Sequence, residues 1–305
     1  MAVPVLAIIV LAMLLLPLPA PLLDFLFTFN IALSLLVMHR IPHPRRQQTR
    51  MEEVRLRDAL AAPARDRNFR PLLYFGGVFG IGIGLLSPHL TVYLLQELHL
   101  SFTAVTALAA ASAVTSALTN TWWGRLGDHF GTKTVVYAGA LLLCTNPLMM
   151  LGVPAAGVWL VVVMHVISGV ATGAFASPAN TLILSVATPA QRPSYLAAFV
   201  AAYAAGQAAG AMLGGGALRA AGALGLDAGD GFFILFAIAT LVRLAGTQLL
   251  GYVHEPGAAA VGHMIRVVAR ARSMSTTFPV DPLLRYGSLH LARVADLIAR
   301  EREAR

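Results

Sequence analysis

A few polar side chains interrupt the long apolar runs of this chain, and they are the residues whose chemistry could matter. Arg243 lies in the middle of the run 232–252, which is otherwise uncharged. A cation in so apolar a setting lines a pathway for a solute, pairs with a backbone carbonyl or snorkels towards water. These alternatives stay open on the sequence alone.

Two further groups of polar residues have helical spacing. His165, Ser168 and Thr172 follow the pattern i, i+3, i+7, and Tyr203 and Gln207 follow i, i+4. Residues at these spacings share one face of a helix. Each group therefore predicts a polar stripe, which either faces a substrate pathway or forms hydrogen bonds between helices.

Common catalytic and cofactor-binding motifs are absent from the sequence. The sequence contains no HExxH, CxxC, GxSxG or Walker-type motif. Cys144 is the only cysteine, so an intramolecular disulfide is impossible and a cysteine-based metal cluster is disfavoured. We therefore predict no catalysis, no cofactor and no metal site.

Charge gathers in one stretch, "GRLGDHFGTK" at 124–133. We interpret it as a tight turn between two helices. Gly124 would permit close contact between helices, and Gly131 would supply the positive φ of a short reversal. Arg125 and Lys133 would hold the turn on the cytoplasmic side of a membrane.

The acid of this turn is Asp128, which precedes the next apolar run. An aspartate there can cap the following helix and complement the positive end of its dipole. We also expect it to form an ion pair with a basic residue, either Arg125 or Arg192.

The elements that must position these residues are membrane helices. The chain of 305 residues is 57% hydrophobic and 12% charged, whereas a soluble domain is roughly 45–50% apolar with about 25% charged residues. Uncharged runs of about 18 residues or more indicate transmembrane helices. We predict an all-α polytopic membrane protein with the lipid bilayer as its first partner and with six spans at 72–95, 103–123, 134–151, 158–186, 195–218 and 232–252.

The amino-terminal part differs from these six spans. Residues 3–38 are apolar apart from Asp24, and "PLPAP" divides them. This pattern predicts a membrane hairpin of two short spans, 4–17 and 22–38. The expected domains are a hairpin at 1–38, a basic linker at 39–70, a six-helix unit at 71–254 and a basic tail at 255–305.

The net charge of +8 follows the membrane topology and does not indicate nucleic-acid binding. Residues 39–70 hold nine arginines against four acids, and the tail is also rich in arginine. Basic loops favour the cytoplasmic side, and the loops between the six spans alternate between basic and nearly uncharged. We therefore expect both termini in the cytoplasm.

Glycines recur at four-residue spacing in three of the spans: Gly76, Gly80 and Gly84; Gly169 and Gly173; Gly206, Gly210 and Gly214. Small residues on one helix face let two backbones approach closely in lipid. Tight packing is the main expectation, and sliding of these faces during a conformational cycle is the alternative.

The turn resembles the loop motif of the major facilitator superfamily, Gly-x-Leu-x-Asp-basic-x-Gly-basic-basic. His129 and Thr132 depart from its basic positions. "DRNFRPLLYF", "SPHLTVYLLQELHLS" and "SPANTLILSVATPAQRPSYLAAF" are similar to later helices of such transporters, so the resemblance covers about 67–254.

The resemblance implies the carboxyl-terminal half of a twelve-helix transporter in a bacterial cytoplasmic (inner) membrane. It would move a small solute by alternating access, and its turn would form ion pairs that lock one gating state. Half a transporter also implies a partner, either a second six-helix half or another copy of the chain.

A separate resemblance concerns residues 3–38. "LPLPAPLLDFLFTFNIALSLL" is similar to the first membrane segments of the export-gate family of flagellar and type III secretion systems. The chain is thus expected to be a composite of an export-gate fragment and half a transporter. The alternative functions are a component of a protein-export apparatus and a membrane scaffold that transports nothing.

Overall fold

The computed structural model describes residues 62–188 and 191–274. The chain divides into two units at Ala259–Ala260, and each is described by itself. The predicted hairpin at 1–38 and most of the linker at 39–70 lie outside the described residues. The region predicted as a basic tail, 255–305, contains a helix, α10, at Val261–Met274.

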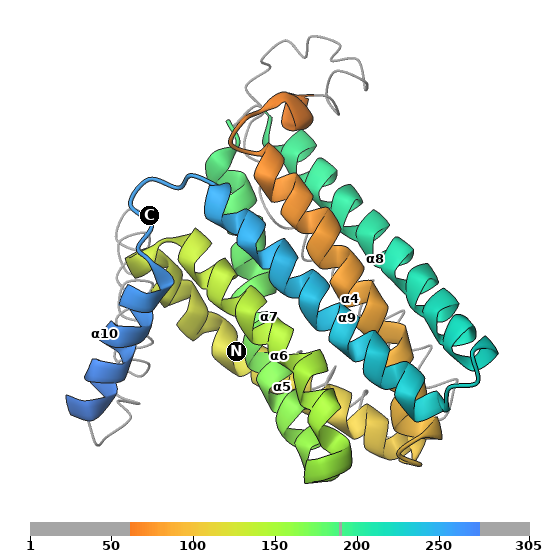
Figure 1. Cartoon of the computed structure of the whole chain (residues 1–305). Coiled ribbons are helices and arrows are strands. Elements are labelled where there is room, and N and C mark those ends of the chain that lie inside the picture. The colour runs from red at the N-terminus through yellow and green to blue at the C-terminus, as the bar shows by residue number, and fades with distance from the viewer. Residues whose placement is uncertain (1–61, 189–190, 275–305) are drawn as a thin grey trace, which may run out of the picture. The chain divides into compact units, whose positions relative to one another are not determined.

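Among its described residues, the first unit contains six helices that are long and apolar enough to cross a membrane, which confirms the number of spans predicted for 72–252. Short connections join them, so consecutive helices run in opposite directions (Figure 1). Their bounds are α4 Arg70–Gln96, α5 Phe102–Phe130, α6 Thr132–Ala156, α7 Trp159–Val186, α8 Arg192–Ala223 and α9 Ala228–Leu249. A 3-10 turn, Leu250–Tyr252, follows α9.

Local sequence explains where these helices begin and end. Pro71 and Pro193 occupy the first turns of α4 and α8, where the missing N–H costs nothing. Ser101 caps α5 by accepting a hydrogen bond from the backbone N–H of Ala104. Gly131 and Gly157 end α5 and α6 with φ of +92° and +93°, a conformation that favours glycine.

The helix termini correct one detail of the sequence analysis. Helix α5 continues through most of the predicted turn and ends at Phe130, so the reversal consists of Gly131 alone. Asp128 therefore lies in the last turn of α5, and Asp230 lies in the first turn of α9. Both acids lie at helix ends, outside the predicted spans 103–123 and 232–252.

The packing of the six helices is reciprocal between two triplets, α4–α6 and α7–α9. Helix α4 packs along α8 and α9, whereas α7 packs along α5 and α6 (Figure 1). The first helix of each triplet thus packs on the second and third helices of the other triplet. The two first helices also share a short sequence, Ser-Pro-x-x-Thr, at 87–91 and 177–181.

Glycine makes the closest of these contacts possible. A Cβ atom built on Gly84 would collide with the backbone carbonyl of Gln207, and one on Gly210 would collide with that of Ile81. On the other side of the bundle, a Cβ on Gly169 would collide with the carbonyl of Ser112. The backbones of α4 and α8, and of α5 and α7, therefore lie in direct contact, and the predicted tight packing is confirmed.

Candidate functional site

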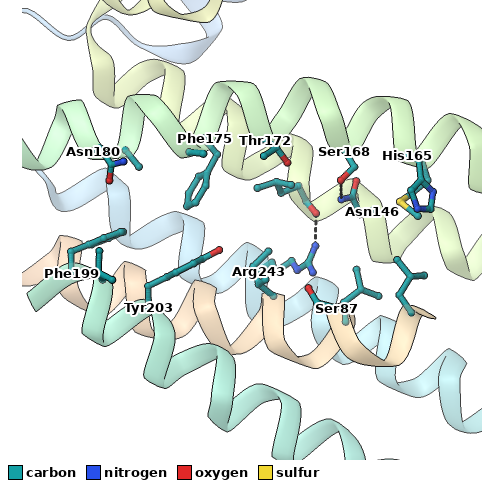
Figure 2. Close-up of a pocket in the computed structure, with 18 residues that line it drawn as sticks. Ser87, Asn146, His165, Ser168, Thr172, Phe175, Asn180, Phe199, Tyr203 and Arg243 are labelled. Carbon is teal, nitrogen blue, oxygen red and sulfur yellow. Dashed lines mark hydrogen bonds between the residues drawn. The ribbon is translucent and has the colours of Figure 1, made fainter. Parts of the chain in front are cut away.

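A cavity of about 410 Å³ lies within the six-helix bundle (Figure 2). Its lining comes from α4, α6, α7, α8 and α9. The polar residues of the lining are Ser87, Asn146, His165, Ser168, Thr172, Asn180, Tyr203 and Arg243. No carboxylate belongs to the lining, so Arg243 is its one permanent charge.

Arg243 reaches this cavity from α9 by passing between two other helices. Its side chain is 1% exposed. Nε donates a hydrogen bond to the backbone carbonyl of Gly82 on α4 at 2.9 Å, and Nη1 donates to that of Leu143 on α6 at 2.7 Å. Gly82 makes the passage possible, because a Cβ atom there would lie 2.5 Å from Cγ of Arg243. Carbonyl pairing and cavity lining, which the sequence left as alternatives, therefore occur together.

A second polar cluster adjoins Arg243 and joins α6 to α7. Nδ2 of Asn146 donates a hydrogen bond to Oγ of Ser168 at 3.0 Å. One turn before Ser168, Nδ1 of His165 donates to the backbone carbonyl of Val161 at 2.9 Å. A carbonyl can only accept, so this bond leaves Nε2 of the neutral imidazole as an acceptor. Oδ1 of Asn146 is buried and has no hydrogen-bond partner among the described residues.

The cavity has an aromatic wall and an open side. Phe175, Phe199 and Tyr203 form the wall, and their rings lie 6.2 Å apart in the pairs Phe175–Tyr203 and Phe199–Tyr203. Ser87, Thr172, Ala176, Asn180 and Val200 also line the cavity but are exposed. The cavity therefore opens on the side of the bundle that carries these residues.

The structure brings most of the predicted pathway candidates together. His165, Ser168, Thr172, Tyr203 and Arg243 all line the cavity, whereas Gln207 does not. Gln207 instead lies at the close backbone contact between α8 and α4. The sequence analysis missed Asn146. An amide in the middle of an apolar run was a signal of the same kind as Arg243 and could have identified it.

Outside the cavity, a separate cluster of hydrogen bonds lies at the one-residue reversal between α5 and α6. Glu255, which follows α9, accepts hydrogen bonds from the backbone N–H groups of Thr132 at 3.3 Å and Lys133 at 2.6 Å. These N–H groups belong to the first turn of α6, where the helix itself offers no acceptor. Glu255 therefore caps α6 and places a negative charge at the positive end of its dipole.

Lys133 and Thr134 tie the same segment to α6 from the other direction. Nζ of Lys133 donates hydrogen bonds to the backbone carbonyls of Gly251 and Val253. Oγ1 of Thr134 donates to the carbonyl of Ala259. We call Thr132, Lys133, Thr134 and Glu255 the Glu255 cluster. It fixes the chain after α9 against the start of α6.

Two predictions about the turn are corrected by this arrangement. Asp128 does not cap α6, which has no side-chain cap from its own N-cap residue, and it forms no ion pair with Arg125 or Arg192 within the described residues. Asp128 is exposed in the last turn of α5, and Glu255 occupies the capping position at the start of α6. Gly124 makes no close helix contact, because a Cβ there would meet nothing within 4 Å.

The prediction for Gly131 is confirmed and strengthened. Its φ is +92°, and a Cβ atom would lie 2.7 Å from Cα of Ala258. Conformation and space therefore both require glycine at this position. Lys133, to which we assigned a topological role and a place in the gating turn, belongs to the hydrogen-bonded cluster.

The same end of the bundle has a third connection, at the start of α4. The side chain of Asn68 exchanges two hydrogen bonds with the backbone of His254, at 2.9 and 2.7 Å. Oδ2 of Asp66 accepts a hydrogen bond from the hydroxyl of Tyr195 on α8 at 2.9 Å. The segment after α9 thus contacts the starts of α4 and α6, and the segment before α4 contacts α8.

Comparison with known proteins identifies a family. The family model described as Major Facilitator Superfamily matches residues 72–278. The match includes α5 to α9 completely and all but the first two residues of α4. A search of the curated proteins found no match.

Proposed function

The chain belongs to the Major Facilitator Superfamily, and we propose that its six-helix bundle is one half of a transporter that moves a small solute by alternating access. Members of this superfamily are transporters and not enzymes. The observation that carries the proposal is the cavity, whose polar lining is buried on one side and exposed on the other. A solute bound there would remain exposed on one side, and a partner half could cover it.

The reciprocal packing of the two triplets supports a rocking mechanism. Transporters of this superfamily contain two inverted three-helix repeats in each half and bind substrate near the middle of the membrane. Here α4 and α7 are the first helices of the triplets, and both contribute polar residues to the cavity, Ser87 and Asn180 among them.

The Glu255 cluster is our candidate for the gating element. It holds the reversal after α5 against the segment after α9 through backbone and side-chain hydrogen bonds. A movement that separates α6 from α9 at this end must break these bonds.

The partner of the bundle, in our proposal, is a second copy of it. Helix α8 presents small residues outward. Four of its alanines are exposed: Ala201, Ala204, Ala205 and Ala208. Small outward residues suit close helix packing in lipid, and α8 also lines the open cavity.

Cysteine crosslinking tests this partner. In a Cys144→Ala background, Ala204→Cys in the purified chain in lipid vesicles is expected to form a disulfide-linked dimer on mild oxidation. Leu241→Cys on α9, where Leu241 is 66% exposed, is the control and should remain monomeric. Crosslinking at both positions or at neither would contradict the second-copy proposal. Solute uptake by vesicles that contain the dimer tests transport itself.

We further propose that the protein lies in the bacterial inner membrane with both termini in the cytoplasm. The arginine distribution supports this orientation. Single cysteines at positions 45, 129 and 270 are expected to be labelled only from the cytoplasm, and those at 155 and 226 only from outside. His129, Ala155 and Leu226 are exposed, so a membrane-impermeant maleimide can reach them. External labelling at position 129 would contradict the proposed orientation of the six spans.

The two alternative functions have less support. The export-gate resemblance is confined to residues 3–38, outside both the described residues and the region matched by the family model. A scaffold that transports nothing would not require a cavity lined by buried polar groups. Uptake measurements in vesicles distinguish this alternative from the proposed transporter.

A further inference from the structure

The cavity carries a positive charge that no described acid balances. A guanidinium has five N–H donors, and Arg243 uses Nε and Nη1 for the two backbone carbonyls. Its Nη2 makes no hydrogen bond to a described residue. Carbonyl groups orient the guanidinium but do not neutralise it, and a buried charge without a counter-ion is costly. The cavity therefore favours an anion over a neutral solute, and a neutral solute over a cation.

An unsatisfied acceptor lies beside this charge. Asn146 is 5% exposed and its Oδ1 has no partner among the described residues. Asn146 follows Leu143 by three residues on α6, so its side chain emerges one turn from the carbonyl that Arg243 contacts. Figure 2 shows both side chains facing the same space. Nε2 of neutral His165 is a second acceptor in this region.

Apart from its eight polar residues, the lining is apolar. Phe175 and Phe199 are 7% and 5% exposed, and Leu86, Leu143 and Met164 add aliphatic surface. A volume of about 410 Å³ lies within the range of small-molecule sites, which combine an apolar wall with a few convergent polar groups.

We propose that this cavity binds a small organic monoanion that has an apolar body and a hydrogen-bond donor next to its carboxylate. The carboxylate accepts from the unused N–H groups of Arg243. The adjacent hydroxyl or N–H donates to Oδ1 of Asn146, and the apolar body packs on Phe175 and Phe199. This substrate class rests on the proposed transport function, but binding can be measured without transport.

Three matched probes test the proposal by isothermal titration calorimetry on the full chain in lipid nanodiscs. Mandelate has a phenyl ring, a carboxylate and an adjacent hydroxyl. Phenylacetate lacks the hydroxyl, and mandelamide lacks the charge. Mandelate is expected to bind about tenfold more tightly than phenylacetate, because a buried acceptor without a partner is costly. Mandelamide is expected to bind more weakly still. Equal affinity for mandelate and mandelamide would overturn the proposal.

Two variants locate the hydrogen bond. Asn146→Leu removes the acceptor while it keeps the branched shape of the side chain, and it is expected to abolish the preference for mandelate over phenylacetate. Asn120→Leu makes the same change at an exposed residue of α5, a helix that contributes nothing to the cavity lining, and it should keep the preference. A preference that survives Asn146→Leu would contradict the assigned donor site.

A third variant tests the charge. Arg243→Gln is expected to lose anion binding while its elution in size-exclusion chromatography stays that of the parent. If Arg243→Gln fails to fold, the comparison of mandelate with mandelamide on the parent chain still decides the point. Probe binding without uptake by any vesicle preparation would support the anion site and contradict the transport function. Uptake of another solute with no probe binding would do the reverse.

Discussion

Gly210→Ala is expected to lower the free energy of unfolding of the bundle, whereas Gly216→Ala on the same helix is expected to raise it slightly. The two positions differ only in what a new methyl group would meet. At Gly210 it would collide with the carbonyl oxygen of Ile81 and lie 2.9 Å from N of Leu85, both backbone atoms of α4. At Gly216 it would meet nothing within 4 Å.

The sign of each effect follows from these surroundings. Backbone atoms cannot move aside as a side chain can, so α4 and α8 must separate along their contact when Gly210 is enlarged. Such overpacking costs about 1–3 kcal/mol. In open space the same methyl group only restricts the helix backbone, and alanine stabilises a helix relative to glycine by roughly 0.5–1 kcal/mol.

Unfolding in mixed micelles by titration with dodecyl sulfate measures both variants on one scale, with intrinsic tryptophan fluorescence as the signal. Equal shifts of the two midpoints would mean that the backbones of α4 and α8 are not in contact. The contact between α5 and α7 offers a second matched pair. A methyl group in Gly169→Ala would meet the carbonyl of Ser112, whereas one in Gly124→Ala would meet nothing within 4 Å.

The close glycine contacts between helices could be predicted from the sequence because their signal is local. Four-residue glycine spacing places small residues on one face whatever the partner helix is, and the lipid setting gives that face one main use. The six spans were predictable for the same reason, since each depends only on the hydropathy of its own residues. The partner of each glycine face was not predictable, because it depends on how the triplets pack.

The cavity shows where local signals stop. The His165 stripe and Arg243 were found because each is polar in an apolar run, and both line the cavity. Gln207 has the same signal, yet it does not line the cavity, and its side chain forms a hydrogen bond with Tyr203. A polar residue in a span indicates that a partner is needed, but only the packing decides whether the partner is a neighbouring backbone or a bound solute.

The turn shows a different limit. Its glycine reversal was predictable, since a positive φ is a property of one residue. Its cap was assigned to Asp128, the nearest acid in sequence, but the acid that caps α6 lies 122 residues after Lys133. Glu255 belongs to a segment that we had assigned to the tail, and no spacing rule connects it with the turn. Only the return of α9 to the start of α6 brings the two together.

Glu255→Gln is therefore expected to destabilise the start of α6, whereas Asp128→Asn should leave it nearly unchanged. Glutamine keeps the length of the side chain and one carbonyl oxygen, so it can still accept from one of the two N–H groups of Thr132 and Lys133. It loses the second bond and the negative charge. Loss of a cap costs about 0.5–2 kcal/mol, and loss of a charge at a helix end typically costs about 0.3–1 kcal/mol. Because Glu255 is half-buried, we expect a total near ~1–2 kcal/mol.

Hydrogen–deuterium exchange places the effect at the residues concerned. The amides of Thr132 and Lys133 have Glu255 as their acceptor, so a peptide that spans 128–136 should exchange about tenfold faster in Glu255→Gln. Asp128→Asn is the matched control, since it removes an acid four residues before Thr132 that bonds neither amide. Faster exchange in Asp128→Asn and unchanged exchange in Glu255→Gln would return the capping role to Asp128. If α6 must detach from the segment after α9 during gating, Glu255→Gln should also favour the detached state by the same factor, because the bonds that it loses exist only when the two are together.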